Sequence, residues 1–166
     1  MPIAIETERL SLRELTEADA ENVFRLNESP AIVRYVGEPT LKSAAEGLEL
    51  LRTRLLPQYA GYGVGRLAVI VRADARFIGW CGLKFIPEDN EYDLGYRYFE
   101  RDWGQGYATE AARAVVAWGR QQLPGKRIVG KAMLGNVASI KILQKIGLRF
   151  EGNAQAHDGE VAVYVA

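Results

Sequence analysis

The stretch 103–120, "WGQGYATEAARAVVAWGR", decides how the rest of the chain is interpreted. Two glycines, Gly104 and Gly106, precede an alanine-rich run that contains no proline. Small apolar residues recur at helical spacing from Ala108 to Gly119, which predicts an amphipathic helix. The first two glycines then lie at the helix N-terminus. There they either allow a tight turn or bring main-chain N–H groups against a phosphate.

Strands are predicted on both sides of this helix. Residues 66–72, 77–85 and 92–99 have strand patterns, and the short connections between them favour an antiparallel meander. The order of strand, glycine turn and helix therefore follows a meander and does not open a βαβ unit. After the helix come a strand at 127–132, a helix capped by Asn136 and ended by Gly147, and terminal strands at 148–151 and 160–165.

The first third of the chain predicts one strand followed by helices. Leu10 and Leu12 alternate with polar residues, as in a half-buried strand. Thr16 and Asp19 form a capping-box pattern at the start of a helix. Further helices are expected from Pro30 and over 40–57, followed by a flexible glycine-rich connector at 61–65. We therefore expect a single mixed α/β domain of the α+β type over residues 1–166, with a mostly antiparallel sheet of about six to seven strands.

The composition excludes several classes of protein. Apolar residues make up 48% of the chain, and Lys plus Arg equals Asp plus Glu at 21 each. This neutral balance argues against nucleic acid as the main partner. The apolar runs are too short to span a membrane, and the first residues do not resemble a secretory signal, so a cytoplasmic protein is expected. Cys81 and His157 are the only cysteine and histidine, so we expect no disulfide and no metal site.

The glycine turn alone does not identify a ligand. A dinucleotide-binding fingerprint would need a third glycine where Thr109 stands. A P-loop would end in Gly-Lys-Ser or Gly-Lys-Thr, which is absent. By itself, Gly-x-Gly is more often a plain strand-to-helix turn than a phosphate site.

Four longer stretches carry a resemblance to a known family. They are "ETERLSLRELTEADA" from residue 6, "FIGWCGL" at 77–83, "DLGYRYFERDWGQGYATEAA" from residue 93 and "NVASIKILQKIGLRFEG" from residue 136. Their order and spacing resemble the GNAT-superfamily acetyltransferases, most closely the ribosomal-protein N-terminal acetyltransferase (RimJ/RimL-like) branch. The resemblance covers nearly the whole chain and favours the phosphate interpretation of the turn.

The resemblance implies that acetyl-CoA binds at the turn through main-chain N–H groups. Two registers of the family motif fit. Arg101-x-x-Gly104-x-Gly106 matches its letters, whereas Trp103-x-x-Gly106-x-Ala108 matches the branch pattern and is preferred, because it starts the helix at residue 107 or 108. The cofactor-binding residues implied here are Trp103, Gly104, Gln105, Gly106, Tyr107, Ala108 and Thr109.

The resemblance also implies that the strand before the turn supports the cofactor. The pantetheine arm would lie beside 96–99, in a gap where this fourth predicted strand splays from the fifth, 127–132. Backbone groups of Tyr98 and Phe99 would hold the acetyl carbonyl, and Gly95 fits a bulge that opens the gap. Asn136 and Ser139 match a cofactor-contacting Asn-x-x-Ser, although Asn136 can equally be a plain N-cap.

The catalytic residues are less clearly marked. Many superfamily members place a tyrosine that protonates the leaving thiolate seven residues after the capping asparagine. This chain has Leu143 at that position. Ser139 is then the candidate acid, with Tyr96 and Tyr98 as alternatives. Asp93 is the candidate base, and a water relay is the alternative. Cys81 is interpreted as a small buried residue, so we expect direct acetyl transfer without an acetyl-cysteine intermediate.

Three hypotheses follow. The first is an acetyl-CoA-dependent N-acetyltransferase acting on a primary amine, either a protein N-terminus or a small molecule. The second is a non-catalytic acyl-CoA-binding module, suggested by Leu143. The third is an unrelated nucleotide-binding protein with a similar turn. The family also makes a homodimer possible.

Overall fold

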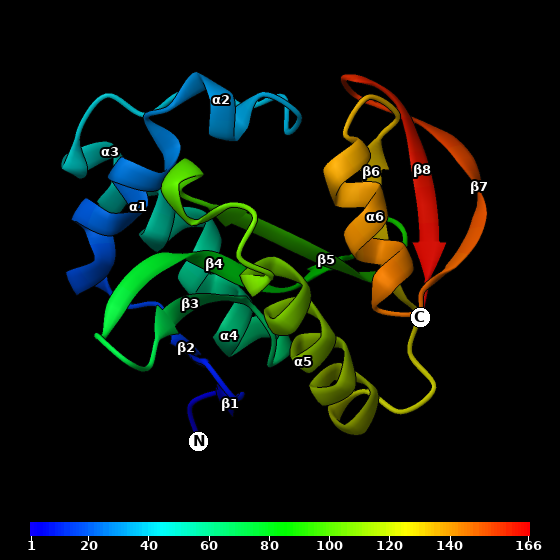
Figure 1. The fold of residues 1–166 in the computed structure, drawn as a ribbon, viewed down its shortest axis with the longest axis horizontal. Helices are drawn as coiled ribbons and strands as arrows, with labels where there is room; N and C mark the ends of the chain where they lie inside the picture. The colour runs from blue at the N-terminus through cyan, green and yellow to red at the C-terminus, as the bar shows by residue number, and fades with distance from the viewer.

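The computed structural model describes residues 1–166 (Figure 1). Its strands are β1 (Ala4–Glu6), β2 (Leu10–Glu14), β3 (Arg66–Val71), β4 (Arg76–Ile86), β5 (Glu91–Tyr98), β6 (Ile128–Met133), β7 (Arg149–Ala156) and β8 (Gly159–Val165). Its helices are η1 (Glu17–Asp19), α1 (Ala20–Asn27), α2 (Pro30–Val33), α3 (Ala44–Leu50), η2 (Leu51–Leu55), α4 (Leu56–Tyr62), η3 (Glu100–Asp102), α5 (Tyr107–Gln122) and α6 (Val137–Lys145). No helix is long and apolar enough to cross a bilayer.

The strands form one 8-stranded sheet in the order β1-β2-β3-β4-β5-β6-β8-β7. All neighbours are antiparallel except β5 and β6, which are parallel. The expected number of strands was therefore too low. It missed β1, because a three-residue strand that carries the single apolar pair Ala4 and Ile5 gives almost no periodic signal.

The parallel pair corrects a second expectation. Helix α5 carries the chain from the end of β5 back to the start of β6, so β5, α5 and β6 do form a βαβ unit. The short hairpins before β5 suggested a continuing meander. A helix from Tyr107 to Gln122 is long enough to return the chain to the opposite end of the sheet, which makes the next strand parallel.

The early helical region also extends further than predicted. The segment η2 is a π-helix, in which the Leu56 N–H reaches the Leu51 carbonyl. This wider turn precedes Pro57, which sits in the first turn of α4, where a missing N–H is tolerated. The helix then continues to Tyr62 and ends at Gly63, whose φ of 67° is left-handed. The first two residues of the expected glycine-rich connector, Gly61 and Tyr62, are therefore helical.

Helices cover both faces of the sheet (Figure 1). One face packs on α5, whose Ala112 and Val116 belong to the larger hydrophobic core with sheet residues such as Leu83. The other face packs on α1 and η2, where Trp80 meets Val23 and Leu51 in a smaller core.

The sheet splits between β5 and β6, as predicted. The two strands pair only where Tyr92–Leu94 meets Ile128–Gly130. Beyond Gly130, β6 pairs with β8 alone, and the rest of β5 has no neighbour on that side. Glu91 braces the closed end, because it is buried and accepts from Arg127 at 3.0 Å and Lys131 at 2.5 Å.

Candidate active site

The glycine turn ends in an unpaired helix N-terminus. Gly104 and Gly106 have φ of 76° and 81°, a left-handed conformation that disfavours a side chain. Gly106 is the N-cap and α5 begins at Tyr107, which agrees with the helix start expected from the preferred motif register. The backbone N–H groups of residues 107–109 donate to no other group of the chain. Four such groups are expected at any helix start, and glycine leaves the approach to them open.

Arg9 holds this turn in place, a role that sequence reasoning missed. Its guanidinium donates to the Gln105 carbonyl at 2.9 Å and to the Glu110 carboxylate at 2.7 Å. It also lies over the Tyr107 ring, 4.5 Å from the centroid. Glu110 accepts from the Arg9 backbone and from Thr7 as well. The connection between β1 and β2, which carries Thr7 and Arg9, therefore fixes both the glycine turn and the first turn of α5.

Glu110 is an ionised anchor in this arrangement. Burial by itself would raise the pKa of this carboxyl, but the bonds from the Arg9 backbone, Thr7 and the Arg9 guanidinium outweigh it and lower the pKa. Thr109, Arg113 and Lys145 border the same region and line a polar groove beside the turn. The basic side chains and the free N–H groups together suit an anionic ligand.

The backbone of β5 faces the gap at alternate residues. Tyr92 N–H donates across the closed end to the Arg127 carbonyl. By the alternation of an antiparallel ladder with β4, the backbone groups of Tyr96 and Tyr98 point the same way. Trp103 Nε1 donates to the Tyr98 carbonyl at 2.9 Å, so the exposed Trp103 side chain anchors the turn to the strand.

Phe99 departs from its predicted role. Its N–H donates to the Ile78 carbonyl on β4, and its own carbonyl accepts from Asp102. Both backbone groups are therefore already bonded and cannot hold an acetyl carbonyl. The N–H donors that face the gap belong to Tyr96 and Tyr98, so the nearest such donor lies one residue before the predicted Phe99.

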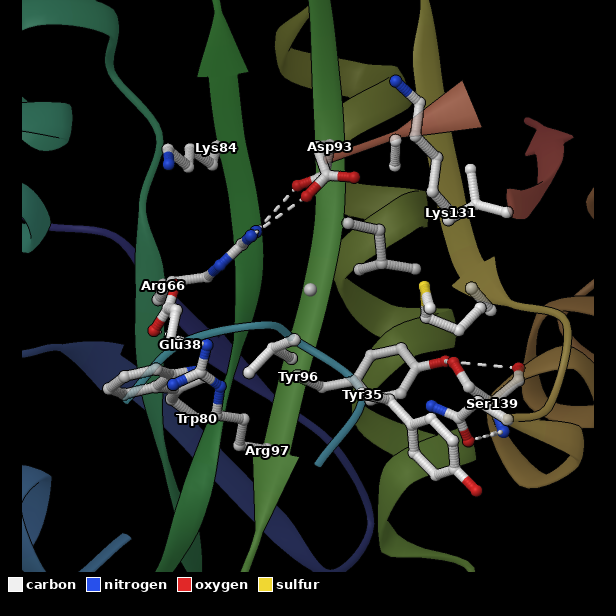
Figure 2. A pocket seen from close by; sticks show the side chains of 18 of the residues that line it. Tyr35, Glu38, Arg66, Trp80, Lys84, Asp93, Tyr96, Arg97, Lys131 and Ser139 are labelled. Carbon is white, nitrogen blue, oxygen red and sulfur yellow. Dashed lines mark hydrogen bonds and ion pairs between the residues drawn. The ribbon is translucent and has the colours of Figure 1, made fainter. Parts of the chain in front are cut away.

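Two hydroxyl groups meet across the gap. Tyr96 Oη and Ser139 Oγ share a hydrogen bond of 2.7 Å (Figure 2). Ser139 N–H donates to the Asn136 side chain at 3.2 Å, so Asn136 is the N-cap of α6. Burial raises the pKa of the Tyr96 phenol, although its bond to Ser139 opposes the shift. The phenol therefore stays protonated at neutral pH.

Three other residues considered for the chemistry, Leu143, Tyr98 and Cys81, lie in the core. Leu143 is buried and packs against Gly130. A Cβ added to Gly130 would stand only 2.5 Å from Cδ2 of Leu143. The Tyr98 hydroxyl is buried and has no hydrogen-bond partner. Cys81 is also fully buried, and this burial raises the pKa of its thiol to about 12. A thiol in that environment stays protonated and is a poor nucleophile.

Asp93 is paired with an arginine that crosses the sheet. Arg66 donates to the Asp93 carboxylate at 3.0 Å and to the Asp93 and Gly82 carbonyls at 2.7 Å each. The guanidinium passes directly over Gly95, where a Cβ would stand 2.4 Å from Nη2. Gly95 pairs with Gly82 in regular register, so the predicted bulge is absent. The glycine is required by the close approach of Arg66 instead.

Asp93 and Ser139 line one cavity of about 290 Å³, which opens beside the gap. In Figure 2, Asp93 lies with Arg66 and Lys84 on one side of the cavity, and Ser139 lies with Tyr96 on the other. The cavity also includes Tyr35, Val36 and Glu38 from the segment after α2 and Ala156 and Asp158 from the β7–β8 end. His157 is exposed in the β7–β8 turn and does not line it.

Comparison with known proteins agrees with this geometry. Residues 9–149 match the model of the acetyltransferase (GNAT) domain. The chain is 28% identical over 149 residues to the uncharacterized N-acetyltransferase YoaA of Bacillus subtilis, covering 89% of this chain and 84% of YoaA. The YkkB protein of Bacillus subtilis is 29% identical over 164 residues, covering 95% of this chain and 92% of YkkB.

Solved structures share the whole fold. An acetyltransferase from Agrobacterium tumefaciens superposes with a TM-score of 0.85 at 28% identity, covering 99% of this chain and 94% of that one. RimL, a ribosomal L7/L12 α-N-protein acetyltransferase solved with coenzyme A, gives a TM-score of 0.85 at 18% identity, covering 99% and 97%. The members of this family use acetyl-CoA. The chain belongs to the GNAT family of acetyltransferases.

Proposed function

We propose that this protein moves an acetyl group from acetyl-CoA to a primary amine by direct transfer in a ternary complex. One observation carries the proposal. The split between β5 and β6 runs from the glycine turn, with its free N–H groups, to a cavity lined by Asp93, Tyr96 and Ser139. A donor and an acceptor can therefore approach the same point from two sides.

The chain's residues fit the coenzyme. The pyrophosphate would be held by main-chain N–H groups between Gly104 and Thr109, where no Cβ blocks the approach at either glycine. The pantetheine arm would bond to the unpaired backbone groups of Tyr96 and to the Tyr98 N–H, since the Tyr98 carbonyl already accepts from Trp103. Asn136 and Ser139 would contact it from the opposite side of the gap.

Acetyl-CoA supplies an activated thioester carbonyl when bound. The N–H of Tyr98 faces the gap and can stabilise negative charge on a carbonyl oxygen, an effect worth roughly 3 kcal/mol per donor in other enzymes. The Tyr96–Ser139 hydroxyl pair is proposed as the source of the proton for the leaving thiolate. Asp93 is proposed as the base for the incoming amine, directly or through water, because Oδ1 has no bond within the chain.

The acceptor class remains broad in this proposal. The motifs place the chain in the RimJ/RimL-like branch, and the fold of RimL supports that placement. A protein N-terminal α-amine and a small-molecule amine both fit a cavity that opens beside the gap. The alternative function is a non-catalytic acyl-CoA-binding module. The hydroxyl pair argues against it, because it supplies a proton donor where Leu143 does not.

Thiol release from acetyl-CoA with a panel of amines and N-terminal peptides tests the proposal. We expect Tyr96→Phe to lower kcat by about 10²-fold or more while KM for acetyl-CoA changes little. Tyr62→Phe, at an exposed tyrosine on α4, is the matched control and should keep full activity. Binding of acetyl-CoA without thiol release for any amine would establish the non-catalytic alternative.

A further inference from the structure

Two cations in the cavity wall have no anionic partner. Lys84 on β4 and Arg54 on η2 both line the cavity, and neither forms an ion pair or hydrogen bond with another side chain. Surface cations are often unpaired, but Lys84 is half-buried. An unpaired cation in a cavity wall is a candidate for binding an anionic ligand.

The neighbouring carboxylates are already used. Asp93 pairs with Arg66 at 3.0 Å, and Glu38 pairs with Arg97 at 3.0 Å. Lys131 is held by Glu91, outside the cavity. Asp158 forms no ion pair and lies at the other side of the cavity mouth, against Gly37. Lys84 and Arg54 are therefore the cavity-lining cations that have no ion-pair partner within the chain.

The surroundings of Lys84 are unfavourable to its charge. Burial, followed by the positive charges of Arg66 and Arg54, lowers the pKa of Lys84, while Asp93 and Glu38 oppose the shift. An incoming anion would relieve this cost. Lys84 is also close to the proposed reaction site. Its cross-strand neighbour on β5 is Asp93, and the split between β5 and β6 begins just after the next residue, Leu94.

A local distortion gives Arg54 its place. It lies in the π-helical segment η2, and such segments are frequent at functional sites. The wider turn comes just before Pro57 and places Arg54 on the wall of the cavity, with Leu55 and Gln58.

The cavity favours a small ligand. Its volume is about 290 Å³, near the lower end of the range for small-molecule sites. The segment after α2 meets the β7–β8 turn over its mouth, since a Cβ at Gly37 would overlap the Asp158 carboxylate. Tyr35 approaches the β6–α6 connection in the same way, 3.6 Å from a Cβ at Gly135.

We infer that the amine acceptor is a small molecule that also carries an oxyanion group, a carboxylate or a phosphate, bound by Lys84 and Arg54. This inference rests on the proposed acetyl transfer and names the substrate class of the same site. The amine would lie beside the split and the anion one strand away, over β4.

Matched pairs of acceptors test the inference. Beta-alanine and 4-aminobutyrate are compared with their amides, and O-phosphoethanolamine is compared with ethanolamine. We expect the anionic member of at least one pair to have a kcat/KM about tenfold or more above its neutral partner. The pair that shows the preference identifies carboxylate or phosphate as the group. Equal kcat/KM within every pair would overturn the inference and leave acetyl transfer standing.

Two variants locate the preference. Lys84→Gln and Arg54→Gln should each raise KM for the anionic acceptor and leave KM for its neutral partner unchanged. Lys126→Gln, at an exposed lysine in the loop after α5, is the control and should change neither. Arg54 is exposed, so its variant remains informative even if Lys84→Gln folds poorly. A preference for the anionic acceptor that persists in both variants would contradict the assignment of Lys84 and Arg54 as the anion-binding residues.

A binding readout separates this inference from the proposed function. Thermal unfolding is measured with coenzyme A present and each acceptor added. We expect the anionic acceptor to raise Tm for the wild type and not for Lys84→Gln. If no acceptor is acetylated, this shift still decides the inference, whereas the missing turnover refutes the proposed function. The absence of any shift with all three anions would overturn the inference.

Discussion

The replacement of Gly106 by alanine separates the two possible roles of the glycine turn. Gly106 has φ of 81°, and an L-residue in the left-handed region costs about 1–2 kcal/mol. Its Cβ would also stand 3.3 Å from Arg9 Nη2, so the guanidinium must give way slightly. In a chain of this size, 1 kcal/mol lowers Tm by about 2–4 °C. We therefore expect Gly106→Ala to lower Tm by about 2–8 °C.

Gly125→Ala is the matched control. Gly125 has φ of 75°, nothing lies within 4 Å of its Cβ position, and it follows the far end of α5. The backbone cost should be the same, but no cofactor contact is lost. Gly104→Ala, with φ of 76° and equally open space, tests the other register of the motif.

Binding of acetyl-CoA, measured by isothermal titration, distinguishes these variants. A Cβ at Gly106 would displace a phosphate from one N–H donor, which is worth about 1.5–3 kcal/mol to a charged acceptor. We expect Kd to rise about 10-fold to 100-fold, whereas Gly125→Ala should keep the wild-type Kd. An unchanged Kd for Gly106→Ala, or an equal rise for Gly125→Ala, would show that the turn is only structural.

Three further predictions concern single side chains. Cys81→Ala should lower stability by roughly 1 kcal/mol and leave kcat unchanged, as measured by denaturation and thiol release, because the buried thiol takes no part in transfer. Asp93→Asn should lower kcat by about 10²-fold or more at neutral pH in the thiol-release assay, because Asp93 is the proposed base. The lowered pKa of Glu110 contributes stability above its unfolded value of 4.5, and this is lost as pH falls through the folded pKa. Glu110→Gln should therefore be less stable than the wild type at pH 7 in denaturant titrations, with the difference shrinking below pH 4.5.

The elements that sequence predicted well are those with strong local signals. The α5 start at Tyr107, the Asn136 cap and the β3–β4–β5 meander depend on residues that are close in the chain. The split between β5 and β6 was predicted only from the family resemblance. The π-helix η2 was missed because Pro57, which follows it, predicts a helix end in the sequence.

The site depends on contacts between distant segments, and these were mostly missed. Arg9 reaches the Gln105 carbonyl from 96 residues away, and Tyr96 meets Ser139 from 43 residues away. All four residues lie in the motif stretches, but nothing in the local pattern says which of them touch. Gly95 stands out in the strand pattern, but the guanidinium that requires a glycine there comes from Arg66 on β3, which no local pattern indicates.

Thermal unfolding with and without acetyl-CoA tests the central claim most directly, with NAD and ATP as controls. A ligand at about 100 times its Kd adds roughly 2.7 kcal/mol to the free energy of unfolding, which corresponds to a rise in Tm of about 5–11 °C. We predict this rise for acetyl-CoA alone. No rise with acetyl-CoA, or an equal rise with NAD or ATP, would contradict the assignment of the turn between β5 and α5 to the coenzyme.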